Sequence, residues 1–95
     1  MKIAVSRSGG IGGVRVSRSI DTERLEPDEA RALEELVSAS QFFELPPVLR
    51  GTSPRPDRYE YRLEVELGGR THAVIAREEL LPEALRRLAA DVLRR

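Results

Sequence analysis

Apolar and polar residues alternate in two short segments near the start of the chain, residues 2–7 and 14–20. An alternation with a period of two is typical of strands that bury one face. The glycine-rich segment GGIGG lies between the two segments, so they predict a β-hairpin. The apolar members of the alternation are Ile3, Val5, Val14, Val16 and Ile20.

The clearest strand of the chain is the segment RYEYRLEVEL, residues 58–67. Its apolar and aromatic side chains face one way, and its charged side chains face the other. Gly68 and Gly69 follow, and the segment RTHAVIA comes directly after them. A pair of glycines between two alternating segments predicts a second hairpin.

Apolar residues at helical spacing predict two helices. The first begins at Pro27 and ends near Gln41, and the second begins at Pro82. A proline suits the first position of a helix, where its missing N–H is not needed. The predicted buried stripes are Ala30, Leu33, Leu36, Val37 and Ser40 in the first helix, and Leu81, Leu85, Leu88 and Val92 in the second.

Residues 46–57 contain four of the six prolines of the chain, and they predict a stiff loop. Such a stretch can neither continue a helix nor form a central strand. The element order is therefore ββαββα. We expect one α+β domain over residues 1–95, in which a four-stranded antiparallel sheet carries both helices on one face.

The charge balance and the terminal sequence limit the classes of partner. The 16 basic and 16 acidic residues give a net charge of zero, so we expect no nucleic acid partner, because such binding depends on neutralising phosphates. The first ten residues hold no apolar run typical of a secretory signal. No stretch approaches the roughly 20 apolar residues of a membrane span. We therefore expect a cytoplasmic protein with no membrane partner.

Few residues of the chain suit catalysis or metal binding. The chain has no cysteine, and His72 is its only histidine. A two-residue turn at Gly68–Gly69 would pair Val65 with His72 on the apolar face, whereas a three-residue turn would place the histidine on the polar face. In either case we interpret His72 as a structural or surface residue and not as a catalytic one. The sequence predicts no enzyme, no cofactor and no metal site.

The GGIGG segment favours a hairpin over a phosphate-binding loop. It fits neither glycine pattern of nucleotide-binding proteins, and a strand follows it where a phosphate loop needs a helix N-terminus. Pairing Val5 with Val14 would turn the chain at Gly9–Gly10 and point Ile11 away from the core. Pairing Val5 with Val16 would put Ile11 in the turn itself. Ile11 is then either an ordinary exposed residue or an anchor for the pocket of a partner.

Several segments together resemble the emfourin family. They are SGGIGG with the short basic strand and Asp21 after it, LEPDEARALEELVSASQFFELP, PDRYEYRLEVELGGRTHAV and LPEALRRLAADVLRR. The resemblance spans nearly the whole chain. Emfourins are small bacterial proteins that inhibit protealysin, a thermolysin-like zinc metallopeptidase.

The resemblance implies an inhibitor that blocks the active-site cleft of such a protease by steric occlusion, and that is monomeric when free. Thermolysin-like enzymes prefer a bulky apolar side chain just after the scissile bond, which would give Ile11, or an apolar residue on another exposed loop, a pocket to fill. The alternative is a non-catalytic interaction domain that uses loops or the polar sheet face around Ser6, Ser17 and Ser19. The residues we expect to contact the protease are Ser8, Gly9, Gly10, Ile11, Gly12, Gly13, Arg55, Pro56 and Asp57.

Overall fold

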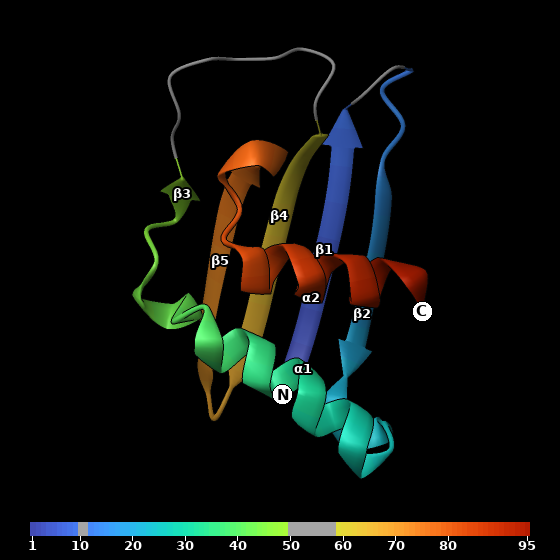
Figure 1. The fold of residues 1–95 in the computed structure, drawn as a ribbon, viewed down its shortest axis with the longest axis vertical. Coiled ribbons are helices and arrows are strands. Elements are labelled where there is room, and N and C mark those ends of the chain that lie inside the picture. Colours follow the sequence, from blue (N-terminus) through green and yellow to red (C-terminus); the bar gives the residue numbers. More distant parts are fainter. Residues whose placement is uncertain (10–11, 50–58) are drawn as a thin grey trace.

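A computed structural model describes residues 1–9, 12–49 and 59–95. In this part of the chain, five strands form one sheet in the order β2-β1-β4-β5-β3, and two helices cross one face of it (Figure 1). The strands are β1 Lys2–Gly9, β2 Val16–Asp21, β3 Val48–Leu49, β4 Tyr59–Leu67 and β5 Arg70–Arg77. The helices are α1 Pro27–Ala39 and α2 Glu83–Arg94, with short 3₁₀ helices η1 Thr22–Arg24, η2 Phe42–Glu44 and η3 Glu78–Leu80.

The sheet confirms the predicted α+β class but corrects its strand count and pairing. Strands β2, β1, β4 and β5 are antiparallel to their neighbours, as expected. The fifth strand, β3, lies in the segment predicted to be a loop, and it pairs in parallel with β5. The carbonyl of Pro47 accepts a hydrogen bond from the amide of Ile75 at 2.8 Å. An edge strand tolerates a neighbouring proline because one side of its backbone needs no partner.

The second hairpin is present as predicted, and of the two turns considered for it the two-residue turn is the one formed. Gly68 and Gly69 have φ angles of 57° and 80°, and the turn pairs Leu67 with Arg70. Two successive positive φ angles are typical of a type I′ turn, which matches the twist of the flanking strands. This register places His72 opposite Val65. The histidine therefore lies on the apolar face.

The first hairpin differs from both registers considered from the sequence. Val5 pairs with Arg18, and Val16 pairs with Arg7, so the connection is longer than a tight turn at the glycines. Val14 lies outside β2 and is 66% exposed. The register is physically sound because it places Ile20 opposite Ile3 on the buried face, and Ile20 packs against the core.

The two helices follow their predicted stripes. In α1, Leu33 and Val37 are buried, and in α2 all the predicted apolar positions from Leu85 onward are buried. The α1 helix ends with Ser40 as its cap, since Gln41 adopts a left-handed conformation with φ of 52°. Buried Thr22 ties η1 to α1, because its hydroxyl donates to the Glu34 carboxylate at 2.8 Å.

The core lies between the helices and the two central strands. Strands β1 and β4 contribute four side chains that are at most 1% exposed, and α2 covers them with four more. Above α2 in Figure 1, the ends of β1 and β2 extend beyond the helices. The central core residues are Ile3, Val5, Leu63, Val65, Leu85, Leu88 and Val92.

No helix in the ranges that the structure describes is long and apolar enough to cross a membrane.

Replacing Leu63 with alanine should lower the free energy of unfolding by about 2–5 kcal/mol, because Leu63 is fully buried and its removal leaves a cavity. Leu67→Ala is the matched control. It removes the same atoms from the same face of β4, but Leu67 is 46% exposed. This control should cost no more than about 1 kcal/mol. Urea denaturation of both variants makes the comparison, and equal losses would contradict the position of the core.

Replacing Gly68 with valine should lower the free energy of unfolding by about 1–2 kcal/mol, because a β-branched residue is strained at a positive φ. A Cβ at this position meets no atom within 4 Å, so the whole cost is conformational. Gly68→Asn should cost about 0.5 kcal/mol or less, since asparagine tolerates this conformation. Thermal unfolding of the pair tests the turn, and an asparagine variant as unstable as the valine variant would count against it.

Candidate functional site

The candidate site is the end of the sheet where β1 finishes and β4 begins. Two of the predicted contact residues, Ser8 and Gly9, are the last residues of β1. Ser8 pairs with Glu60, and Gly9 pairs with Tyr59. Because β1 has a hydrogen-bonded neighbour on each side, the backbone leading to this end is held in place by the sheet.

Gly12 and Gly13 lie in the connection between β1 and β2, and both have positive φ angles, of 97° and 65°. A Cβ at either position meets no atom within 4 Å. Glycine is therefore required here by backbone conformation and not by close packing. The connection leads into strand β2, so it lacks the helix N-terminus with which phosphate loops bind their ligand.

The other predicted contact residues cannot be placed. Gly10, Ile11, Arg55, Pro56 and Asp57 lie outside the described residues. Of the predicted set, the structure thus places Ser8, Gly9, Gly12 and Gly13, and it brings the first two against the start of β4.

Sequence reasoning missed an arginine–tyrosine pair at the same end of the sheet. The guanidinium carbon of Arg7 lies 4.4 Å from the centre of the Tyr59 ring, a cation–π contact. The Tyr59 ring also meets the Tyr61 ring edge-on, with 6.5 Å between the ring centres. Tyr59, which the alternation of RYEYRLEVEL places on the apolar face, is only half-buried and lies beside Gly9.

One feature of the sequence indicates where this pair lies. Arg7 continues the inward alternation of Ile3 and Val5, so a charged residue occupies a position expected to be apolar. A charged side chain is rarely buried without a partner. Arg7 therefore marks the position at which β1 leaves the buried core.

His72 has a structural role, as expected. Its Nε2 lies 2.7 Å from the carbonyl oxygen of Leu45, and since a carbonyl only accepts, Nε2 donates. The imidazole also meets the rings of Phe42 and Phe43, at 5.5 and 6.2 Å between centres. These contacts join β5 to the segment after α1, so His72 positions η2 against the sheet.

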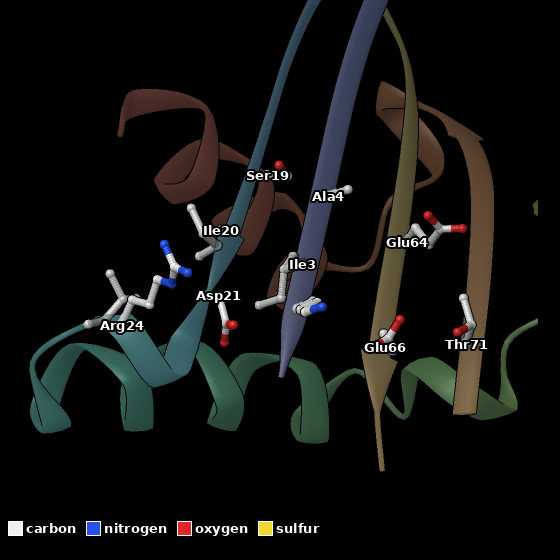
Figure 2. Close-up of a pocket in the computed structure, with 11 residues that line it drawn as sticks. Ile3, Ala4, Ser19, Ile20, Asp21, Arg24, Glu64, Glu66 and Thr71 are labelled. Atoms are coloured by element: carbon white, nitrogen blue, oxygen red, sulfur yellow. The ribbon is translucent and has the colours of Figure 1, made fainter. Parts of the chain in front are cut away.

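The opposite, uncovered face of the sheet carries mixed charges. Figure 2 shows a depression on it, where Ala4, Ser19 and Glu64 project from neighbouring strands. Glu64 also pairs with Arg62 at 3.6 Å, and both side chains remain well exposed. An exposed pair of this kind is a solvated surface contact of small energetic weight.

The acidic residues of this depression do not form a metal site. Asp21 at its rim accepts a hydrogen bond from the amide of Glu23 at 3.0 Å, and so caps η1. Among the described residues, no group of three or more histidine, cysteine, aspartate or glutamate side chains could hold a metal ion.

Comparison with known proteins identifies the family. No curated protein and no solved structure was found to match the chain. The sequence model of the emfourin family matches residues 5–93, which include both helices except the end of α2, and nearly all of the sheet. The chain therefore belongs to the emfourin family.

Proposed function

We propose that this protein inhibits a thermolysin-like zinc metallopeptidase of the protealysin type by occluding its active-site cleft. Membership of the emfourin family implies a protease-inhibitor role. The observation that carries the more specific proposal is the β1–β4 end of the sheet, where the Arg7–Tyr59 pair lies on the strands, and where an exposed valine and two glycines with positive φ lie in the connection that follows β1.

The side chains at this end suit occlusion better than binding of the zinc. Zinc takes nitrogen, sulfur and carboxylate ligands. The described groups on which we base the contact are a guanidinium, an aromatic ring and an apolar side chain, which belong to Arg7, Tyr59 and Val14. The carboxylate at this end belongs to Glu60, which follows Tyr59 on β4 and so lies on the opposite face of the sheet. Arginine and tyrosine are enriched among the residues that dominate binding energy at protein interfaces. An inhibitor with these groups fills the cleft by shape and leaves the metal to the enzyme.

The fold also prepares this surface before binding. Gly9 is fixed opposite Tyr59 by the sheet register, and Arg7 holds the Tyr59 ring from the neighbouring strand. Groups that are already ordered lose less conformational entropy when they dock. The proposal places the inhibitor in the cytoplasm and makes it act without catalytic residues of its own.

Titration against a thermolysin-like protease tests the function directly. The purified chain should abolish cleavage of a small peptide substrate at one inhibitor per active site. A protealysin-type enzyme and thermolysin are the two targets, and a serine protease is the control for general interference with the assay. Full activity of both metallopeptidases, at excess inhibitor and after long incubation, would refute the proposal.

Val14→Asp should weaken inhibition at least about tenfold, because a charge at an apolar contact must be desolvated on docking. The same result is expected for Ile11→Asp, as the family resemblance implies. Leu67→Asp is the matched control, since Leu67 is also an exposed apolar residue but lies at the Gly68–Gly69 end of the sheet. The inhibition constants of the three variants give the comparison. If Leu67→Asp weakened inhibition as much as Val14→Asp, the contact surface would lie elsewhere.

A further inference from the structure

The two edge strands of the sheet differ in how much unpaired backbone they expose. In the described part of the chain, one edge is β3, which has only two residues and follows a proline. The other edge is β2, which has six residues, Val16–Asp21. An edge strand of this length presents unpaired N–H and C=O groups and can pair with another chain.

The hydrogen-bond pattern identifies the outward groups of β2. The amide of Thr22 donates to the carbonyl of Met1, its opposite residue, at 2.8 Å. In an antiparallel pair such bonded positions recur at every second residue. The even-numbered residues of β2 therefore point their backbone groups at β1. Ser17, Ser19 and Asp21 point theirs away from the sheet.

The same alternation can be followed through β1, β4 and β5, and a hydrogen bond at the β3 edge of the sheet confirms it. It predicts that the odd-numbered residues of β5 point their backbone groups away from β4. The amide of Ile75 donates to the carbonyl of Pro47 at 2.8 Å, as this alternation requires. The assignment of the outward groups of β2 thus agrees with hydrogen bonds on both sides of the sheet.

One of these outward groups is already occupied. The Arg18 side chain folds over the edge, and its Nη1 donates to the carbonyl of Ser17 at 2.8 Å. Its Nε donates to the main-chain oxygen of Arg95 at 3.3 Å, so the same guanidinium also reaches the end of α2. A strand added along β2 would have to displace the side chain from the Ser17 carbonyl.

Arg95, whose main-chain oxygen accepts the hydrogen bond from Arg18, is itself held by two carboxylates. The Arg95 guanidinium bonds Asp91 at 2.8 Å within α2 and Glu29 of α1 at 2.9 Å. The hydrogen bond to Glu29 is the main cause that raises the pKa of Arg95 above its ordinary value. Edge strand, α2 and α1 are therefore joined through one chain of charged side chains.

We propose that Arg18 is a latch that closes the β2 edge against strand addition by a second copy of this chain. The occupant follows from the symmetry of β2. A two-fold axis at Ser19 sets Ser19 against its own copy and Ser17 against Asp21 of the copy. Every outward N–H and C=O of these three residues then pairs with an outward group of Ser17, Ser19 or Asp21 in the copy.

The side chains also favour this register. It places a serine hydroxyl opposite a carboxylate, and hydroxyl donors pair well with carboxylate acceptors. A two-fold axis at Arg18 would instead set two guanidiniums directly opposite each other, and like charges in that position destabilise a strand pair. The edge is thus self-complementary in the register centred on Ser19. In the free protein, the Arg18 side chain occupies the Ser17 carbonyl that this register needs.

The test compares self-association of three variants with that of the unaltered chain by sedimentation velocity over a wide range of concentrations. Arg18→Thr removes both latch hydrogen bonds and keeps a residue that favours strands. It should lower the dissociation constant of the dimer about tenfold or more. Arg62→Thr is the matched control. It makes the same change on β4, whose backbone has strand neighbours on both sides, and it should not associate.

The third variant, Arg18→Thr with Ser19→Pro, assigns the association to this edge. Proline removes the outward N–H of Ser19 without touching the bonds between β2 and β1. The double variant should return to the monomer, with circular dichroism confirming that it is folded. In Arg18→Thr alone, amide exchange at Ser17 and Ser19 should slow as the concentration rises.

Two results would overturn the latch. One is an Arg18→Thr variant that associates no more strongly than the unaltered chain. The other is association that persists in the double variant or appears equally in Arg62→Thr. Protease inhibition by each variant is measured in parallel, and because the latch does not depend on the proposed inhibitor function, either proposal can fail without the other.

Discussion

The burial of one sheet face beneath two short helices is the constraint on which the rest of the structure depends. Ile3 and Leu63 lie at the centre of that face, and α2 crosses it through Leu85 and Leu88. A chain of 95 residues supplies a single core of this kind and little more. The helices therefore cover the middle of the sheet and leave the ends of β1 and β2 beyond them (Figure 1). The candidate contact surface is the part of the apolar face that the helices do not reach.

The sequence predicted those elements whose limits are marked by local chemistry. Pro27 marks the start of α1, and Gly68–Gly69 marks the turn between β4 and β5, for which only two lengths were considered. The first hairpin lacked such a mark, because GGIGG permits several connections and the valines near it fit more than one pairing. Its register places Ile20 opposite Ile3 on the buried face, while β4 holds β1 from its other side along its whole length. The pairing of β1 with β4 joins residues 50 to 64 positions apart, and no local pattern shows it.

The pairing of distant strands also explains why the sequence did not predict the arginine–tyrosine pair at the candidate site. Arg7 and Tyr59 meet only because β1 and β4 are neighbours, so their contact follows from topology and not from spacing along the chain. Strand β3 was missed because two residues are too few to show an alternation. In contrast, the glycines of the site could be identified from the sequence. Gly12 and Gly13 adopt the positive φ angles for which glycine is suited, whatever lies around them.

Under the two proposals made above, an inhibitor that acts through a sheet end has two requirements, which different parts of the fold meet. Its docking end must present ordered side chains, and the Arg7–Tyr59 pair beside Gly9 provides them. Its long edge must not present unpaired backbone, since an open edge would pair with any extended segment, including the partner's own strands. Arg18 meets this second requirement from the edge strand itself, with Arg95 as its anchor. In these proposals, the side chains of Arg7 and Tyr59 govern what the sheet end can bind. The side chain of Arg18 prevents the β2 edge from binding another strand through its backbone.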